Sequence, residues 1–386
     1  MKSAEKKRIK LCHVIGEFVG GGVETVLLRY FSFIDAEKYE LWVVAHGLKV
    51  QECADEFEKE GFHIAYLTPK RVSFYQNYKD FIDLFKREKF DIVHSHLTEW
   101  SCVPLTAALQ VGIKVRISHS HMVEHPHGFI NKIYYGTRLL WGRLVATHYF
   151  SCGKEAGEYL YGKSNVQARH VRVINNAFDI SLFAWDELKR NEVRKELNIE
   201  PNTVCIGHVG RFDEQKNHKF IIEVFRKYHK MNPNSCLILI GKGHLEGNVS
   251  ENIAKYDLTE CVKLLGIRND VNELYLGMDA FLFPSLYEGL GIVAIEAQVS
   301  NLPVLAANVL PHEAKIVNSM QFLDLNDGLD VWINKLNEMV NNNERKTMTD
   351  DIARSGFEIT AAAKSLDHMY EVMRYEPKKY GKHDKC

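Results

Sequence analysis

The sequence lacks paired cysteines, a long apolar run and an excess of either charge. Its eight cysteines include no C-x-x-C pair, and Cys205 and Cys236 lie inside apolar runs. This scatter indicates free thiols in a reducing compartment and excludes a disulfide framework or a zinc-ribbon site. No stretch approaches the roughly 20 apolar residues that span a bilayer. Because 49 basic residues face 50 acidic ones, a nucleic-acid-binding protein is disfavoured.

The two ends of the sequence are basic. The first ten residues carry five basic residues and one acidic one, and only Leu11–Ile15 follows as an apolar run. A signal peptide needs an apolar core of about 7–15 residues, so we expect a buried first strand and a cytoplasmic protein. Residues 374–385 carry five basic residues against two acidic ones. Two interpretations stay open: contact with the inner, anionic face of the membrane, or solvated, frayed ends.

Short apolar runs alternate with longer amphipathic stretches along all 386 residues. A single core rarely grows past roughly 250–300 residues, so two domains are expected. Strands that alternate with helices predict βαβ units and parallel sheets. The expected strands are Ile9–Ile15, Leu41–Ala45, His63–Leu67, Ile92–His96, Val115–Ser118, Ala146–Ser151, Val171–Ile174, Thr203–Val209, Cys236–Ile240, Val262–Leu265, Ala280–Pro284 and Pro303–Ala307.

A polar, charge-rich segment at 186–201 separates the two runs of this pattern. The predicted fold class is therefore α/β, with two Rossmann-like, doubly wound parallel-sheet domains at 1–185 and 186–355, followed by 356–386. Ligands of such sheets bind beyond the carboxyl ends of the strands, so two facing sheets are expected to form a cleft.

The loop after the first expected strand contains Gly20, Gly21 and Gly22, with a helical run from about Glu24. Glycines and a helix N-terminus allow close approach of an anion. The loop is neither a P-loop nor a clean G-x-G-x-x-G, so a plain flexible turn remains an equal alternative.

A second strand-to-helix loop carries two cations, in the segment Gly210–Asn217. Arg211 and Lys216 there can neutralise a diphosphate, the arginine through its planar fork and the lysine as a point charge. The alternative is that both are solvent-facing loop charges.

The segment Phe281–Ala297 is the most informative in the chain. An apolar strand is followed by Glu288, by the turn Gly289-Leu290-Gly291, and by a helix that carries Glu296. The turn can offer N–H groups to a phosphate, and the two carboxylates can accept bonds from sugar or ribose hydroxyls. Glu296 could instead be an ordinary exposed helix residue, although its apolar neighbours indicate that a carboxylate there needs partners.

These motifs resemble those of the retaining GT4 glycosyltransferases of GT-B fold, especially the bacterial capsule and exopolysaccharide type. The resemblance rests on G-R-x4-K-N at 210–217 and E-x7-E at 288–296, with further similarity at 13–25, 91–96 and 173–179. It implies a nucleotide-sugar donor held mainly by the C-terminal domain and an acceptor held mainly by the N-terminal one. It also implies a final helix that crosses back to the first domain, matched here by Phe357–Met373, and no metal cofactor.

The resemblance also assigns roles to individual residues. Arg211 and Lys216 are implied to bind the donor diphosphate, Glu288 the donor-sugar hydroxyls and Glu296 the ribose. Backbone or border contacts to the donor are implied for a further set: Gly21, Gly22, Gly210, Gly266, Ile267, Arg268, Gly289, Leu290 and Gly291. The chain departs from the family pattern at Ala177 and at Lys242.

Histidines crowd the ends of two successive expected strands, at positions 94, 96, 119, 121, 125 and 127. A metal site and a set of satisfied core histidines both fit this pattern, and the resemblance favours the second. The family has one functional histidine in this region. His119 matches it best and His121 is the alternative, and we expect a positioning role.

The predicted function is transfer of a sugar, by default from a UDP-sugar, to an acceptor hydroxyl with retention at the anomeric carbon, in cell-surface polysaccharide synthesis. The acceptor class includes lipid-linked saccharides at the inner membrane face. No carboxylate is placed as a nucleophile, unlike in retaining glycosidases. Three alternatives stay open: a sugar-nucleotide epimerase of GT-B fold, a non-catalytic nucleotide-sugar-binding subunit and, last, a dinucleotide-dependent oxidoreductase.

Overall fold

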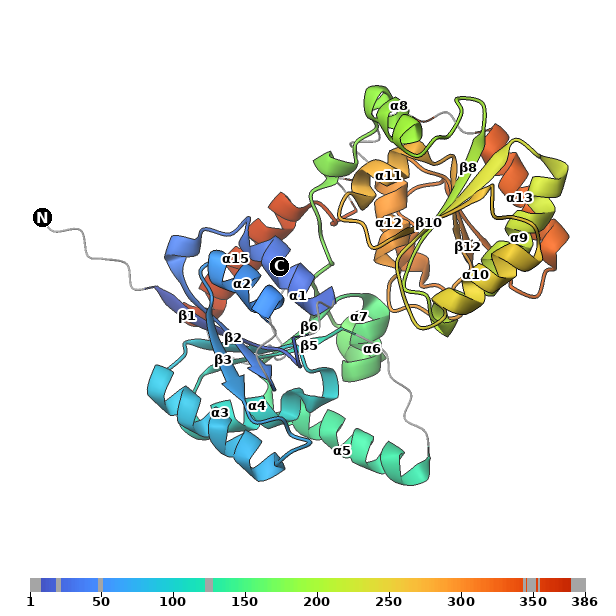
Figure 1. Cartoon of the computed structure of the whole chain (residues 1–386). Coiled ribbons are helices and arrows are strands. Elements are labelled where there is room, and N and C mark those ends of the chain that lie inside the picture. The colour runs from blue at the N-terminus through green and yellow to red at the C-terminus, as the bar shows by residue number, and fades with distance from the viewer. Residues whose placement is uncertain are drawn as a thin grey trace, which may run out of the picture. The chain divides into compact units, whose positions relative to one another are not determined.

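The computed structural model describes residues 8–18, 22–47, 51–121, 128–342, 345, 352 and 355–375 (Figure 1). Contacts within the chain divide it into two compact units. The first is formed by Met1–Phe178 together with Gly356–Cys386, and the second by Asp179–Ser355. The expected first boundary, at 185, lies seven residues beyond this division.

The first unit is built around a seven-stranded sheet in the order β3-β2-β1-β4-β5-β6-β7. Every pair of neighbouring strands is parallel. The strand order reverses between β1 and β4, which is the position where ligands bind in doubly wound sheets. The strands are β1 Ile9–Val14, β2 Tyr39–His46, β3 His63–Leu67, β4 Ile92–Ser95, β5 Val115–Ser120, β6 His148–Ser151 and β7 Val171–Val173.

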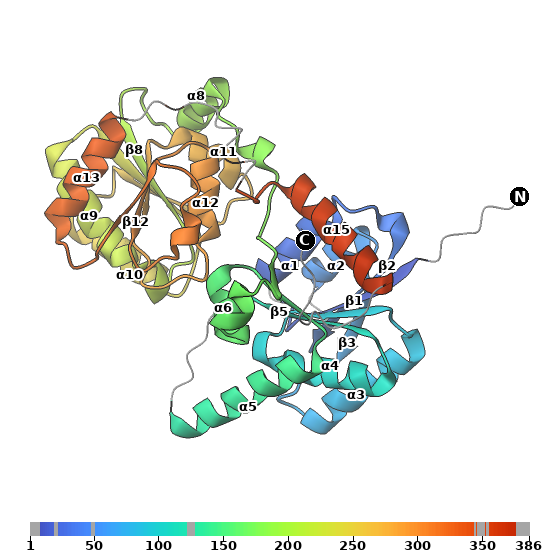
Figure 2. The same cartoon turned by 180° about the vertical axis from the view of Figure 1, so that it is seen from behind.

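Helices cover both faces of this sheet, as a parallel sheet requires. Side chains of α1, α2 and α15 share one buried cluster with the strands, whereas α3, α4 and the end of α5 belong to a second cluster. Figure 2 shows α15 and α1 on one side of the strands and α3, α4 and α5 on the other. The helices are α1 Gly22–Phe31, α2 Gln51–Lys59, α3 Phe74–Glu88, α4 Cys102–Val111, α5 Phe129–Val145, α6 Lys154–Tyr161, α7 Lys163–Gln167 and α15 Ile359–Tyr375, with 3-10 turns η1 Ala36–Lys38 and η2 Thr98–Ser101.

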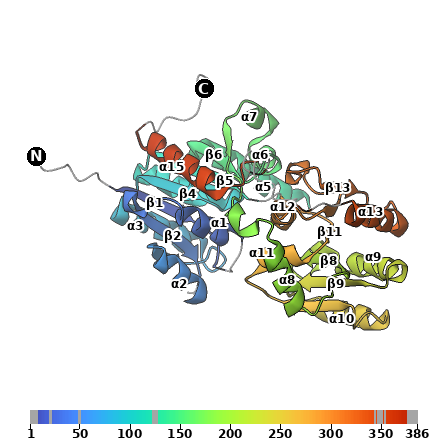
Figure 3. The ribbon, with the colours of Figure 1, turned by 90° about the horizontal axis from the view of Figure 1, so that it is seen from above.

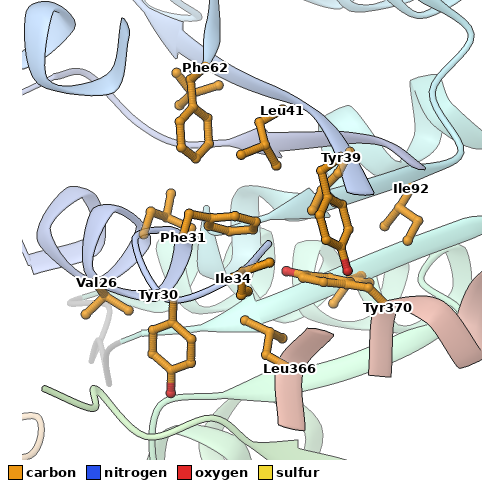
Figure 4. Packing of buried hydrophobic residues seen from close by; sticks show 14 of the residues in the cluster. Val26, Tyr30, Phe31, Ile34, Tyr39, Leu41, Phe62, Ile92, Leu366 and Tyr370 are labelled. Atoms are coloured by element: carbon orange, nitrogen blue, oxygen red, sulfur yellow. The ribbon is translucent and has the colours of Figure 1, made fainter. Parts of the chain in front are cut away.

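The last helix, α15, packs into the core of the first unit although it follows the whole second unit in sequence. Leu366 and Tyr370 point from α15 toward Tyr39 and Ile34 in Figure 4. The hydroxyl of Tyr39 donates to Asp367 Oδ1 over 2.6 Å, so a buried phenol is satisfied by the same helix. Residues 1–178 therefore bury this apolar surface only when the C-terminal helix is present.

The second unit has a six-stranded parallel sheet in the order β10-β9-β8-β11-β12-β13 (Figure 3). Its strands are β8 Val204–Val209, β9 Ser235–Ile240, β10 Val262–Gly266, β11 Ala280–Phe283, β12 Val304–Ala307 and β13 Met320–Leu323. Its helices are α8 Glu187–Glu196, α9 His218–Met231, α10 Glu246–Lys255, α11 Val271–Gly277, α12 Ile292–Val299 and α13 Leu329–Asn341, with 3-10 turns η3 Ile180–Phe183, η4 Glu214–Lys216 and η5 His312–Ala314.

The predicted α/β class with two doubly wound parallel sheets is confirmed. All twelve expected strands are present, with ends that differ by two residues at most. The thirteenth, the edge strand β13 Met320–Leu323, was not expected from the sequence. Only Met320 of this strand is buried, and Gln321 interrupts its apolar residues.

The polar segment at 186–201, expected to separate the domains, belongs to the second unit. Asp186 caps α8 by accepting from the backbone N–H groups of Leu188 and Lys189. Two arginines of this helix turn inward, where Arg190 Nη2 lies 2.5 Å from Asp279 Oδ1 and Arg194 Nη1 lies 3.3 Å from Asp279 Oδ2. The arginines of this segment thus hold α8 to Asp279, the residue before β11, and the segment is not a linker between the domains.

None of the described helices is both long enough and apolar enough to cross a bilayer.

Candidate active site

The candidate site of the second unit lies where four neighbouring strands, β10, β9, β8 and β11, end. The loops after these strands carry the predicted donor-binding residues: 266–268 after β10, 210–217 after β8 and 284–291 after β11. Because all four strands are parallel, their carboxyl ends meet at one edge of the sheet. The strand order reverses between β8 and β11, so the two loops with the charged residues flank the crevice expected there.

Lys216 and Glu288 form an ion pair between these two loops. Lys216 Nζ lies 2.5 Å from Glu288 Oε1, and the side chains are only 15% and 7% exposed. The ammonium also lies 5.0 Å from the centre of the Phe283 ring, a cation–π arrangement. The structure thus joins two of the four groups that the sequence singled out, and each satisfies the charge of the other.

Arg211 has a different partner. Its Nε donates to Asp213 Oδ2 over 2.6 Å, and its side chain is 72% exposed. Asp213 also accepts from the backbone N–H of Lys216 through its other oxygen. The sequence analysis did not single out Asp213, because an acidic residue in a loop is common. In the structure its two oxygens bind Arg211 and the backbone of Lys216, so it fixes the loop that carries both cations. The exposed guanidinium has room to reorient toward a ligand while remaining on the same turn.

Direct hydrogen bonds hold the two charged loops together. The backbone N–H of Leu286 donates to the Gln215 carbonyl, and Gln215 Nε2 donates to the Tyr287 carbonyl over 3.0 Å. Asn217 Nδ2 donates to the Pro284 carbonyl over 3.1 Å. These bonds place Lys216 opposite Glu288 before any ligand binds, which reduces the ordering cost of binding.

A third loop packs against the Arg211 turn through two glycines. A Cβ atom at Gly241 would lie 2.2 Å from the Gly210 carbonyl oxygen, and one at Gly243 would lie 2.3 Å from the Phe212 carbonyl oxygen. The sequence showed G-x-G at 241–243 but not this role. Both positions require glycine because the backbone of the neighbouring turn occupies the space of a side chain.

Replacing Gly241 by alanine is therefore expected to destabilise the second unit by about 1–3 kcal/mol. Gly241 has φ +131°, which side chains rarely adopt, in addition to the clash with Gly210. Denaturant unfolding measures the loss. Gly247→Ala is the matched control, since Gly247 lies in α10 and a Cβ atom added there would meet no other atom within 4 Å, and it should be neutral or stabilising. Equal stability of both variants would contradict the packing described.

The turn Gly289-Leu290-Gly291 leads into α12. Gly291 occupies the N-cap position of α12 with φ 76°, the left-handed region that favours glycine. Leu290 is buried and Gly289 is exposed, so the leucine side chain anchors the turn and only its backbone can face a ligand. The turn precedes the N-terminus of α12, where unpaired N–H groups favour an anion.

Glu296 lies inside α12 and is 9% exposed, so little of its side chain is open to solvent. The Tyr275 hydroxyl donates to Glu296 Oε2 over 3.3 Å. Burial and the adjoining carboxylate hold the pKa of Tyr275 well above its usual range, so the phenol remains a donor. The apolar neighbours of Glu296 in the sequence indicated that its carboxylate needs a partner, and the Tyr275 hydroxyl is such a partner.

The 266–268 loop adjoins the glycine loop. The Gly266 carbonyl accepts from the Gly241 N–H over 2.8 Å, and Ile267 is 73% exposed. Arg268 donates to Asp270 and to Glu196 of α8, and these hydrogen bonds, with Asp270 first, raise the pKa of its guanidinium. Ile267 is thus available to a ligand, whereas Arg268 ties the loop to α8.

In the first unit, five histidines from β1, β4 and β5 and the residues that follow β4 and β5 form a buried cluster at the switch point of the sheet. One chain of contacts runs from His121 to His96 (2.8 Å) and from His96 to His13 (3.0 Å). A second runs from His119 to His94 (3.0 Å) and from His94 to the Tyr370 hydroxyl of α15 (2.7 Å). His13 and Tyr370 were not recognised in the sequence because they lie far from the H-x-H motifs.

Burial lowers the pKa of each histidine in this cluster. The pKa of His13 falls to about 3 and that of His121 to about 4, while those of His94, His96 and His119 fall well below their usual value. The rings are therefore neutral near pH 7. Each contact between two neutral imidazoles uses one N–H and one lone pair.

The same cluster contains two groups of nitrogen atoms spaced for a metal ion. In His13, His94 and His96, and in His96, His119 and His121, one nitrogen of each residue lies within 4.8 Å of the others. Several ring nitrogens of the cluster hydrogen-bond within it, whereas Nε2 of His13 and Nε2 of His119 are buried without a hydrogen-bond partner among the residues that the structure describes. A metal site and a set of core histidines, the two interpretations made from the sequence, therefore both stay open.

The remaining predicted residues of the first unit are only partly described. Gly22 begins α1 and is exposed, whereas Gly21, His125, His127 and the basic segments 1–7 and 376–385 lie outside the described residues. His119 is 3% exposed. His121 is partly exposed at the end of its contact chain, so it is the more accessible of the two candidate histidines.

Comparison with known proteins assigns both halves of the chain. Residues 20–182 match the family described as Glycosyltransferase Family 4, and residues 189–355 match Glycosyl transferases group 1. The chain belongs to the glycosyltransferases of this type, and the alternative of a dinucleotide-dependent oxidoreductase is wrong.

Several relatives span nearly the whole chain. It is 27% identical to the putative glycosyltransferase EpsF of Bacillus subtilis, over 96% of this chain and 98% of the relative. It is 26% identical to the UDP-Gal:alpha-D-GlcNAc-diphosphoundecaprenol alpha-1,3-galactosyltransferase of Escherichia coli (96% and 98%) and to the capsular polysaccharide biosynthesis glycosyltransferase CapH of Staphylococcus aureus (94% and 98%). The protein is thus a glycosyltransferase of the polysaccharide-biosynthesis type.

A solved structure supports the fold. HepE of Anabaena in complex with UDP superposes with a TM-score of 0.71 at 18% identity, covering 96% of this chain and all of that one. The two parallel sheets described above are therefore those of a GT-B fold.

Proposed function

We propose that this glycosyltransferase moves a sugar from a nucleoside diphosphate donor, by default UDP, to an acceptor hydroxyl with retention at the anomeric carbon. The Lys216–Glu288 pair carries the proposal. It places a cation for the diphosphate beside a carboxylate for sugar hydroxyls, at the carboxyl ends of strands that flank the switch point. A ligand with both an anionic and a hydroxyl-rich part fits such a pair.

The proposed chemistry depends on stabilising the leaving group. As the bond from the anomeric carbon to the diphosphate oxygen breaks, negative charge grows on the diphosphate and positive charge on the sugar ring. Lys216 and Arg211, with the N–H groups at the start of α12, stabilise the diphosphate charge. Glu288 orients the sugar, and the bonds between the two loops hold these groups in place beforehand.

Retention is favoured by how the two carboxylates are engaged. Glu288 is paired with Lys216 and Glu296 accepts from Tyr275, so each already serves as a hydrogen-bond acceptor. A glycosidase-like double displacement needs a carboxylate poised as a nucleophile. Attack by the acceptor hydroxyl on the face that the diphosphate leaves, with the hydroxyl proton passing to the departing phosphate oxygen, accounts for retention without one. Proton NMR of the first product formed distinguishes the two anomers.

A histidine of the first unit is proposed to position the donor sugar. His119 matches the family motif, while His121 is the partly exposed member of the pair. Alanine at the functional position is expected to lower kcat more than it raises KM, because it removes alignment of the reacting atoms rather than general affinity.

The acceptor is proposed to be a saccharide on a lipid carrier, at the cytoplasmic face of the membrane. The support is the printed name of the Escherichia coli relative, whose acceptor is attached to diphosphoundecaprenol. A polysaccharide assembled on a lipid presents its growing end at such a surface.

The donor can be identified by thermal-shift screening against UDP-, GDP- and ADP-sugars, because a ligand stabilises the state that it binds. We expect the UDP-sugars to raise Tm and the others to have little effect. No shift with any nucleotide sugar would contradict the proposal. Incubating the donor alone and finding an epimer would instead support an epimerase.

The reaction is proposed to need no metal ion, since Arg211 and Lys216 supply the positive charge. Adding EDTA in excess is therefore expected to change the transfer rate less than about twofold, as measured by release of the nucleoside diphosphate. Complete loss of transfer, restored by a divalent metal, would overturn this part of the proposal and point to the histidine cluster.

A further inference from the structure

Two successive hydrogen bonds connect His119, near the end of β5, to the C-terminal helix. His119 Nδ1 lies 3.0 Å from His94 Nε2, and His94 Nδ1 lies 2.7 Å from the Tyr370 hydroxyl, which α15 brings to the sheet (Figure 4). All three side chains are at most 3% exposed. The other ring nitrogen of His119, Nε2, is buried and has no hydrogen-bond partner within the described part of the chain. The series thus begins at a phenol and ends at an unpartnered nitrogen.

The protons in this series can be arranged in two ways. Burial keeps the pKa values of His94 and His119 well below their usual value, and each neutral imidazole has one N–H and one lone pair. In the first arrangement the Tyr370 hydroxyl donates to His94 Nδ1, His94 Nε2–H donates to His119 Nδ1, and His119 carries its proton on Nε2. In the second arrangement both bonds are reversed, and His119 carries its proton on Nδ1.

The first arrangement leaves fewer groups unsatisfied. In the second, Tyr370 accepts from His94, and its own O–H has no other acceptor among the residues that the structure describes. The lone pair of His119 Nε2 is then unsatisfied as well, whereas the first arrangement leaves only the Nε2–H group. A phenol is also the better donor, and an imidazole lone pair the better acceptor. Because unpaired buried polar groups are costly, the first arrangement is favoured.

We propose that Tyr370 and His94 are positioning residues that hold the proton of His119 on Nε2, so that His119 donates a hydrogen bond to an oxygen atom of the bound donor sugar. The proposal rests on the proposed function, in which a histidine positions that sugar, and it assigns this role to His119. Partners behind a histidine commonly fix its tautomer in this way. With a proton on Nε2, this atom has no lone pair, so it neither removes a proton from the acceptor hydroxyl nor binds a metal ion.

The tautomer of His119 is measured directly by NMR on the full-length chain with isotope-labelled histidine rings. Correlations between the ring nitrogens and the carbon-bound ring protons distinguish the two tautomers, and His119→Gln identifies the signals of His119. We expect wild-type His119, free of ligand and near neutral pH, to carry its proton almost entirely on Nε2. A lone pair on Nε2 would overturn the proposal and favour a metal site at His96, His119 and His121.

Tyr370→Phe removes the hydroxyl and keeps the ring. Either arrangement of the two remaining imidazoles then leaves one donor and one acceptor unsatisfied, so we expect His119 to become a mixture of both tautomers. The matched control is Tyr39→Phe, because the Tyr39 hydroxyl also bonds to α15, through Asp367 Oδ1. The control should keep the single tautomer of wild type. An unchanged tautomer in Tyr370→Phe would show that Tyr370 does not set it and would overturn the proposal.

The same variants connect the tautomer to sugar transfer. In Tyr370→Phe, kcat/KM should fall in proportion to the fraction of His119 that keeps its proton on Nε2, by about two- to tenfold. It should be unchanged in Tyr39→Phe, although both variants lose a buried hydrogen bond. A decrease in both variants alike would indicate a merely structural effect and would overturn the positioning role.

Adding a UDP-sugar to wild type should shift the Nε2 signal of His119. A UDP-sugar that raises Tm and leaves this signal unchanged would overturn the contact between His119 and the sugar. Failure of every nucleotide sugar to bind would overturn the proposed function together with this contact. The tautomer measurement distinguishes the two failures, because it is made on the protein without a ligand.

Discussion

Replacing Lys216 by alanine is expected to lower the rate of sugar transfer by about 10²–10³-fold, the usual cost of removing one group that stabilises charge in a transition state. Lys216 is the less exposed of the two cations of the candidate site, and its Nζ lies 2.5 Å from Glu288 Oε1. Its loss removes stabilisation of the leaving diphosphate and frees the Glu288 carboxylate from its partner. Arg211→Ala should also lower the rate heavily, with less effect on stability, because its side chain is 72% exposed.

The control for this prediction is Lys227→Ala, which removes a lysine from an exposed ion pair with Asp330 on the same unit. It should retain near-normal transfer and stability. The double variant Lys216→Ala with Glu288→Gln removes the unpaired carboxylate, so it should recover stability without recovering activity. Near-normal transfer in both Lys216→Ala and Arg211→Ala would contradict the assignment.

The first unit is expected to lose stability steeply as the pH falls below about 6.5. The five clustered histidines have folded-state pKa values well below their usual value, about 3 for His13 and about 4 for His121, because burial disfavours the charged ring. In the unfolded chain these histidines bind protons near their usual pKa, whereas in the folded chain they stay neutral at that pH. Stability is therefore complete above that pH and declines as the pH falls toward the folded-state values.

For each histidine that is protonated in the unfolded chain but neutral in the folded one, the free energy of unfolding falls by up to about 1.4 kcal/mol for each unit by which the pH decreases. Five histidines acting together would lower it by about 5 kcal/mol between about pH 7 and pH 5.5. Denaturant unfolding at these two pH values, with hydrogen exchange to separate the units, measures the effect. His94→Asn should reduce the pH dependence and the exposed His63→Asn should not; a first unit whose stability is unchanged at the lower pH would contradict this explanation.

The sequence was sufficient for twelve of the thirteen described strands because short apolar runs mark buried parallel strands. It also identified Lys216 and Glu288, which the structure joins, since each follows a strand that ends at the same edge of the sheet. It missed Asp213, Gly241 and Gly243. Their roles depend on contacts within the 210–217 loop and between that loop and the 241–243 loop, and the spacing of residues within one segment does not predict such contacts.

Glu296 shows a different limit. A carboxylate amid apolar residues indicated that partners were needed, but the pattern did not show that Tyr275, from another helix, would be one of them. The histidine cluster is similar. The H-x-H motifs predicted crowding at β4 and β5, but His13 joins the cluster because β1 pairs with β4, and Tyr370 joins it because the C-terminal helix α15 packs on the first unit.

Calorimetric titration of UDP into wild type, Lys216→Ala and Arg211→Ala, with Lys227→Ala as the control, tests the proposed diphosphate site most directly. We expect UDP to bind wild type and the control alike, and each site variant to lose at least about tenfold in affinity, or about 1.4 kcal/mol. Unchanged UDP affinity in both site variants would show that the diphosphate does not bind beside Lys216 and Arg211.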